Sequence, residues 1–537
     1  MLPLPPPPPS NMEFSMPMFR NWVPKCIQPW IYVVCVFGFQ FSGGIYLGAL
    51  ECIQGTTNFM IEDLMLLLYA NLAGMAVYFP MLFRMKFRFT NQQLIIGSAI
   101  VVSVCNLITI HSTFMPLLLL VCFVEGMAKL QGTFEHMSNI QLWITPRRDF
   151  AVFFPVLHIV LLTAIEGSGF LAAWFGYHFS WQMMHVFIVG FMCVIMTVQL
   201  VLCKPFCPMP NRLSLKGIDF GSGLLISLLM LVVSYIFVYG DYKMWMDSRE
   251  LRIMVGVAIF LTGVVLHRLL RVSNPYVDLQ LFNMRNVLLI IIVMVIGEFL
   301  FGSEHTLEEI LFSEVIQLEE HTKEELLLWA LPGVYLGVAI DLLWLKVLKW
   351  KVWKLFAIGF GFIFLYGVLM YFTLDMQVNI EQFRLPILCR GAAYAILAAT
   401  LMWTLDESVP DLEHFFMGLF VFNIFHMYLA GAAGFGIYTH WFSHLMNDNI
   451  VRYGQNLTLT RIDLQHFDFA QYMPQYVHSM MNVTIKQIYG IIVWISGSVM
   501  LLFLLLDIPA VRTNIRKVPR WPVYGIELLG RLTQKIR

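Results

Sequence analysis

The chain has 537 residues, of which 59% are hydrophobic and 13% are charged, and its formal net charge is +0. A soluble protein of this length could not bury so much apolar surface, so we expect lipid to be the medium that most side chains face. The balanced charge gives no reason to expect a nucleic-acid partner. Cys203 and Cys207 form a C-x3-C pair without further ligands, so we expect no metal site.

The apolar runs predict the architecture. A helix needs about 20 mainly apolar residues to cross a bilayer, and about 14 runs meet that rule. They lie near residues 30–50, 64–83, 93–111, 115–134, 150–173, 181–202, 218–239, 251–270, 287–307, 326–345, 354–374, 385–405, 414–436 and 486–506. We therefore predict an all-α, multi-pass integral membrane protein.

Positive charge is distributed unevenly between the loops. Lys and Arg gather in every second loop, and such loops mark the cytoplasmic side of a membrane. The basic loops hold Arg84, Lys86 and Arg88; Arg147 and Arg148; Lys204, Arg212 and Lys216; Arg268, Arg271 and Arg285; and Lys346, Lys349, Lys351 and Lys354. We predict that both termini are cytoplasmic, with a disordered Pro-rich start over residues 1–25 and a basic tail over residues 507–537.

One connection is long. Residues 437–485 separate the last two predicted spans on the outer face, and polar and aromatic residues alternate there. A loop of this length is usually functional or partly helical. We therefore expect a long outer loop that is functional or partly helical.

The polar interval from Asn274 to Asn286 separates two long apolar stretches, and Pro275 prevents a continuous helix through it. Its pattern, Asn-Pro-x-Val-Asp-Leu-x-Leu-Phe-x-x-Arg-Asn, resembles the loop before the C-terminal bundle of the EmrB/QacA-type drug:proton antiporters. These proteins are the fourteen-helix branch of the major facilitator superfamily. Leu385-Pro386 and the segment Asn423–His426 resemble further motifs of that family.

The resemblance implies a major facilitator fold with two six-helix bundles and two extra central helices. The bundles would comprise residues 26–204 and residues 274–506, and the inserted helix pair would comprise residues 205–273. Asp219 is well placed to cap the first helix of that pair.

Several coupling motifs of that family are missing. Ser42, Gly43 and Gly44 stand where the first span of the family carries an acid. The segment Glu166–Gly169 lacks the proline of the family's Gly-Pro signature. The fold is therefore expected to be shared, whereas the family's coupling residues cannot be transferred to this chain.

Charged side chains inside the predicted spans are the candidate functional residues, because a charge in the bilayer needs a partner or a wet cavity. Glu125 and Lys129 lie four residues apart, a spacing that suits an ion pair. The pair is either structural, or it lies in a central cavity and breaks when Glu125 is protonated. Glu166, beside three small residues, is a neutral hydrogen-bond donor between helices or a proton carrier. We expect Glu135 and His136 to be solvated at the cytoplasmic end.

The second half of the chain holds further candidates. Glu298 lies about 20 Å along a helix from Arg285, near the middle of the membrane. It is the best candidate there for a proton or cation site, and a hydrogen bond to another helix is the alternative. Glu304, His305 and Glu308 follow it, as a solvated helix end or an acidic outer mouth. We expect an ion pair between Asp341 and the nearby Lys346 or Lys349.

Substrate-binding candidates lie in the last predicted spans. Arg390 and His426 could bind an anionic group of a substrate or pair with a neighbouring acid, and Asn423 belongs to the family motif that contains His426. A phosphate-binding loop and a soluble catalytic domain are missing from the sequence, so we expect a protein that is not an enzyme and needs no cofactor.

These features predict a transporter that works by alternating access. The resemblance implies that it exports small amphipathic compounds by proton-coupled antiport. The resemblance further implies a bacterial inner membrane, with a periplasmic adaptor and an outer-membrane channel as partners and residues 437–485 as the adaptor contact. Two alternatives remain open: an exporter of one endogenous metabolite or lipid-like molecule with altered or no proton coupling, and a non-transporting receptor or scaffold.

Overall fold

A computed structural model describes residues 18–43, 47–145, 149–206, 215, 218–272, 275–283, 285–374, 379–409, 412–455 and 469–505. The predicted proline run and the predicted basic tail lie outside these residues. We use "inner" and "outer" for the two sides that the charge distribution predicts.

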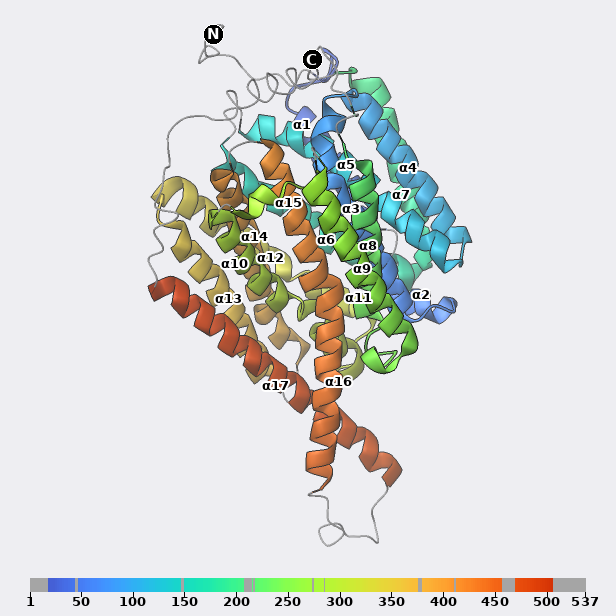
Figure 1. Cartoon of the computed structure of the whole chain (residues 1–537), viewed down its shortest axis with the longest axis vertical. Coiled ribbons are helices and arrows are strands. Elements are labelled where there is room, and N and C mark those ends of the chain that lie inside the picture. The colour runs from blue at the N-terminus through green and yellow to red at the C-terminus, as the bar shows by residue number, and fades with distance from the viewer. Residues whose placement is uncertain are drawn as a thin grey trace.

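The regular elements of the described residues are helices (Figure 1). In the first half of the chain they are α1 (Gln28–Phe41), η1 (Leu47–Ala49), α2 (Leu50–Thr56), α3 (Ile61–Lys86), α4 (Asn91–His111), α5 (Met115–Ile144), α6 (Phe150–His178) and α7 (Trp181–Leu202). Then follow α8 (Phe220–Val238), η3 (Trp245–Asp247), α9 (Arg249–Arg271) and η4 (Leu279–Asn283).

The second half contains several π-helical segments. Its elements are α10 (Arg285–Phe301), η5 (Glu304–Glu308), η6 (Ile310–Val315), α11 (Glu320–Leu327), α12 (Ala330–Leu342), η7 (Leu343–Leu348), α13 (Val352–Thr373), η8 (Ile380–Phe383), α14 (Arg384–Ser408), α15 (Leu412–Phe425), η9 (His426–Ala432), α16 (Ala433–Gly454) and α17 (Phe469–Leu505).

Thirteen helices of the described residues are long and apolar enough to cross a membrane, and they coincide with the second to the fourteenth predicted spans. The chain is therefore a multi-pass integral membrane protein, as predicted. The first predicted span, 30–50, differs because α1 has only 14 residues and ends at Phe41. Ser42 is extended, with φ −75° and ψ 117°, and the sequence Ser42-Gly43 has a low helix propensity.

The predicted outer connection over residues 437–485 is partly helical, which is one of the two expectations for it. α16 continues to Gly454 and α17 begins at Phe469. Asn449 of α16 donates hydrogen bonds to Thr484, at 2.9 Å, and to Gln487, at 3.0 Å, on α17. Figure 1 shows α16 and α17 crossing and extending below the other helices. The polar residues that suggested a loop therefore pair two long helices.

The pair α8 and α9 is anchored at its inner end. Asp219 caps α8 as predicted, because its carboxylate accepts the backbone N–H of Ser222 at 3.2 Å. Arg268 of α9 donates to the same carboxylate at 2.7 Å. α8 packs against α3 and against α16, so it contacts a helix from each half of the chain. That contact is consistent with an insertion between two bundles, which stays a prediction.

The closest helix packing in the first half joins α3 and α5. A Cβ atom on Gly74 of α3 would lie 1.9 Å from the carbonyl oxygen of Phe123, and one on Gly126 of α5 would lie 2.0 Å from that of Asn71. Only glycine allows the two backbones to approach so closely. This crossing fixes the position of α5, the helix that carries Glu125.

We predict that Gly74→Ala lowers the free energy of unfolding of the purified protein by about 1–3 kcal/mol, because the added methyl group forces α3 and α5 apart. Gly97→Ala in α4 is the matched control, since nothing lies within 4 Å of the position that its Cβ would occupy. Unfolding followed by tryptophan fluorescence in detergent checks the prediction. Equal melting temperatures for the two variants would contradict it.

Candidate functional site

Arg390 of α14 is the centre of a buried polar cluster. Its side chain is 3% exposed and forms ion pairs with Glu304, at 3.1 Å, and with Glu308. The hydroxyl of Tyr366 on α13 donates to Glu308 at 2.6 Å, and it lies 3.0 Å from the hydroxyl of Tyr489 on α17. We call Arg390, Glu304, Glu308, Tyr366 and Tyr489 the central network.

The π-helical continuation of α10 supplies both carboxylates of this network. Glu304 and Glu308 begin and end η5, and residues four apart lie on one face of a helix. π-helical turns are uncommon and frequently occur at functional sites. The predicted acidic outer mouth is therefore a buried ion-pair site in which Arg390 holds both carboxylates. The side chain of His305, the third predicted member, lies outside the described residues.

Glu166 approaches the central network from the first half of the chain. Its helix, α6, packs along α12 and α14. Arg390 attracts the Glu166 carboxylate electrostatically, whereas Glu304, Glu308 and Glu324 repel it. Glu166 is therefore within electrostatic range of the network across the contact between the two halves, without a direct ion pair to Arg390 among the described residues.

Glu298 and His426 form a second polar pair in the second half. Nδ1 of His426 lies 2.8 Å from a carboxylate oxygen of Glu298. The ring of Tyr394, on α14, lies 6.1 Å from the ring of His426, and its hydroxyl is electrostatically coupled to Glu298, Glu304 and Glu166. Tyr394 therefore lies between this pair and the central network. His426 pairs with an acid, which is one of its two predicted alternatives.

Glu125 lies apart from these groups. It accepts hydrogen bonds from Ser42 and, at 2.7 Å, from Asn106. No direct ion pair joins Glu125 to Lys129 in the part of the chain that the structure describes, although Lys129 acts on it at longer range. The ion pair expected from the four-residue spacing is therefore wrong, because donors from α1 and α4 reach the carboxylate first.

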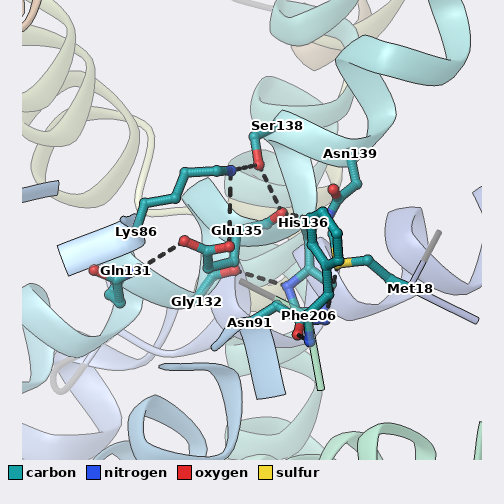
Figure 2. A network of polar contacts seen from close by, with 10 residues as sticks. All are labelled: Met18, Lys86, Asn91, Gln131, Gly132, Glu135, His136, Ser138, Asn139 and Phe206. Atoms are coloured by element: carbon teal, nitrogen blue, oxygen red, sulfur yellow. Dashed lines mark hydrogen bonds and ion pairs between the residues drawn. The ribbon is translucent and has the colours of Figure 1, made fainter. Parts of the chain in front are cut away.

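The polar residues at the inner end of α5 are buried, which corrects the expectation that they are solvated. Figure 2 shows Lys86 reaching from α3 to Ser138 and to Glu135, which is 3.7 Å away. Gln131 donates to Glu135 at 3.2 Å, and Nδ1 of His136 lies 2.7 Å from the carbonyl oxygen of Gly132. This ion pair ties the inner ends of α3 and α5 together.

Asp341 and Asn423 also differ from expectation. Asp341 is fully buried and accepts a hydrogen bond from Thr400 at 3.4 Å. Lys346 forms its ion pair with Asp149, before α6, instead of with Asp341. Asn423 donates to the carbonyl oxygen of Leu419 in its own helix at 2.8 Å, so this hydrogen bond does not connect it to the other candidates.

The short helix α11 connects the two halves at their outer ends. The carboxylate of Glu320 accepts the backbone N–H groups of Glu51, at 2.7 Å, and of Cys52, at 3.4 Å. The ring of His321 lies 5.4 Å from the ring of Tyr177 on α6. Glu324 lies against the backbone of Gly169, where a Cβ atom would be 2.5 Å from its carboxylate. We call these contacts of α11 with α2 and α6 the outer contact.

A buried lysine links the outer contact to η6. Lys323 of α11 is 1% exposed and donates to Glu309 at 2.7 Å and to Ser313 at 3.4 Å. Glu309 directly follows Glu308, the partner of Arg390. The central network and α11 are therefore joined through one short π-helical stretch.

The structure thus brings together six of the predicted residues and separates others. The residues that lie together are Glu166, Glu298, Glu304, Glu308, Arg390 and His426. Glu125 and Lys129 form a separate group. Sequence reasoning missed Tyr366, Tyr489 and Lys323. The sequence signal available for these three residues was a polar side chain at a position within or just before an apolar run.

Several solved structures of membrane transporters superpose on this fold. A peptide transporter POT in complex with sulfate matches with a TM-score of 0.53 at 12% identity, covering 90% of this chain and 95% of that chain. A bacterial homologue of the human drug peptide transporters PepT1 and PepT2 matches with a TM-score of 0.53 at 14% identity, covering 90% and 98%. A mutant of the nucleoside transporter NupG matches with a TM-score of 0.52 at 12% identity, covering 88% and 98%.

These similarities extend over most of each chain and show the major facilitator fold, as predicted. No protein-family model and no curated protein matches the sequence. The resemblance to the drug:proton antiporter branch stays a prediction.

We predict that Arg390→Met lowers the free energy of unfolding by about 3–5 kcal/mol, because it leaves buried carboxylates without their cation. Arg384→Met is the matched control. Its ion pair with Glu381 is exposed and is worth about 0–1 kcal/mol. Adding Glu308→Leu to Arg390→Met should recover part of the loss in thermal unfolding. A double variant no more stable than Arg390→Met would contradict this assignment.

Proposed function

We propose that the protein is a secondary active transporter that moves a small solute across the membrane by alternating access. The observation that carries this proposal is the charged cluster at the contact of α6 with α14. In it, Glu166 from the first half lies within electrostatic range of Arg390 and its carboxylates from the second half. A change of charge at such a contact alters how strongly the two halves attract each other.

The charges of the cluster favour coupling to protons. Two carboxylates, Glu304 and Glu308, pair with one guanidinium, and a third, Glu166, lies within electrostatic range of it. A buried charge without compensation costs several kcal/mol. A proton or a cationic group of a substrate would balance the excess. Glu304 and Glu308 hold Arg390 directly, so Glu166 is the better candidate for the group that gains and loses the proton.

Contacts at both ends of the molecule could separate in turn. On the outer side, α11 joins α2 and α6 through the outer contact. On the inner side, Lys346 pairs with Asp149, and the ring of Phe416 on α15 lies 5.5 Å from that of Phe134 on α5. We propose that opening of one set of contacts and closing of the other exposes the cluster to the two sides alternately.

We infer the substrate class from the two ion pairs that Arg390 already forms. Its guanidinium already binds two carboxylates, so it is a poor partner for an anionic substrate group. We therefore favour a neutral or cationic amphipathic substrate. Export is the direction that the sequence resemblance implies, and the structural neighbours, which are named as peptide and nucleoside transporters, make a peptide-like or nucleoside-like solute the alternative.

A measurement of solute flux in proteoliposomes distinguishes the remaining alternatives. An exporter of one metabolite without proton coupling would transport its solute but ignore a pH gradient. A receptor or scaffold would show no flux of any solute. The buried cluster between the halves supports transport, because a scaffold has no need for several carboxylates at that contact.

We predict that proteoliposomes containing the protein transport an amphipathic cation such as ethidium, or a dipeptide, at a rate that depends on an imposed pH gradient. Glu166→Gln should abolish this dependence, because its side chain cannot ionise. Glu314→Gln, which changes an exposed glutamate, is the control and should transport like the wild type. Flux that responds equally to the gradient in both variants would exclude Glu166 as the proton carrier.

We predict that Glu320→Ala opens the outer contact, because it removes the acceptor of the Glu51 and Cys52 backbone N–H groups. Cys52 is half-buried at this contact and is therefore a native reporter. Its rate of modification by a thiol reagent should rise several-fold, while that of the exposed Cys26, read by peptide mass spectrometry, should not change. The neighbouring Glu319→Ala should leave Cys52 protected, and an equal effect of both variants would contradict the outer contact.

A further inference from the structure

The Glu125 carboxylate is a buried acid outside the central network. Its side chain has no exposed surface, and it lies about 15 Å along α5 from the outer end of the helix at Met115. Glu125 is therefore surrounded by the apolar part of the first half. An acid at that depth needs either partners or a proton.

The two oxygens of this carboxylate have different surroundings. Oε1 accepts hydrogen bonds from the Ser42 hydroxyl and from the Asn106 amide, at 2.7 Å. The Asn106 side-chain oxygen lies 2.8 Å from Nδ1 of His185 on α7. Oε2 is buried and has no hydrogen-bond partner among the described residues. One oxygen is thus held by Ser42, just after α1, and by a chain of polar groups from α4 and α7, whereas the other has no hydrogen bond in the described part of the chain.

The charged and titratable groups around Glu125 do not neutralise it by contact. Lys129 of α5 acts only at longer range. The thiols of Cys105 on α4 and Cys122 on α5 are close enough to interact with it electrostatically, and His185 lies beyond Asn106. α1 contributes the neutral Ser42, and α3 contributes the neutral Asn71, which donates to the carbonyl oxygen of Cys122 at 3.2 Å. The ionised carboxylate is therefore buried without a contacting cation.

We propose that Glu125 is a proton-binding site of the first half, separate from the cluster around Arg390. Its carboxylate takes one proton from hydronium onto Oε2, which leaves a neutral carboxylic acid and one water, and it returns the proton to water later in the cycle. The transport role of this site rests on the proposed function. Proton binding itself does not.

The position of Ser42 connects this proton to the backbone. α1 ends at Phe41, and Ser42, the first residue after it, donates to Glu125. A hydrogen bond to an ionised carboxylate is about twice as strong as one to a neutral group. Protonation of Glu125 therefore weakens the hydrogen bond that holds the end of α1 against α5. The proton thus controls how tightly Ser42, where the first span ends, is held to α5.

Infrared difference spectroscopy of the full-length protein tests the proposal without a substrate. A protonated carboxyl group has a C=O stretching band that the ionised form lacks. We expect lowering of the pH to produce a component of this band that disappears in Glu125→Gln and persists in Glu135→Gln. Glu135 is the matched control because it is a buried acid of the same helix with Lys86 as its partner.

Ser42→Ala supplies a second test that keeps Glu125 in place. Loss of a donor to the ionised form favours the neutral form, so the Glu125 component should titrate at a higher pH than in the wild type. This shift also decides the matter if Glu125→Gln does not fold. A band without a Glu125 component, or one that Ser42→Ala does not shift, would overturn the proposal.

The outcomes for the two proposals can be told apart. A titrating Glu125 component in a protein whose flux ignores the pH gradient would overturn the proton-coupled function and leave the site intact. Flux that follows the gradient, together with no Glu125 component, would overturn this site and leave the function intact.

Discussion

The burial of one guanidinium sets the arrangement of the second half. Arg390 always carries its charge, and in an apolar medium a charge is tolerated only with partners held close to it. Those partners come from η5, and through Glu308 the requirement extends to Tyr366 on α13 and Tyr489 on α17. Three separate stretches of chain must therefore meet around α14 before the charge is satisfied.

This requirement contributes to specificity more than to stability. A buried ion pair is often no more stable than a well-packed apolar replacement, because desolvation offsets the attraction. Its value here is that a wrong arrangement of helices would leave a charge unpaired. The same property suits a contact that changes during function, since the energy of the cluster responds strongly to the gain of one proton or to the approach of Glu166.

Most of the fold could be predicted because the signal is local. Hydropathy over a window of about 20 residues locates a span whatever its neighbours are, and the Asp219 cap depends on a residue three positions away. The pairing of candidate residues could not be predicted in this way. Glu298 and His426 are separated by 128 positions, and Arg390 and Glu308 by 82. Only the tertiary fold determines these contacts.

Two local expectations failed for the same reason. The spacing of Glu125 and Lys129 predicted an ion pair, but Ser42 and Asn106 from other parts of the chain donate to the carboxylate instead. The nearness of Asp341 to Lys346 predicted an ion pair, but Lys346 pairs with Asp149 and Thr400 donates to Asp341. In both cases a polar side chain was assigned to a partner in its own segment, and a distant segment supplied the partner.

The contact of Glu324 with Gly169 has a practical consequence. The carboxylate occupies the space that a side chain on α6 would need, and because it ends a flexible side chain it can move aside for a small one. A large residue at position 169 would displace Glu324 and loosen the packing of α6 against α11. This one position therefore offers a way to weaken the outer contact without altering the contacts on the inner side.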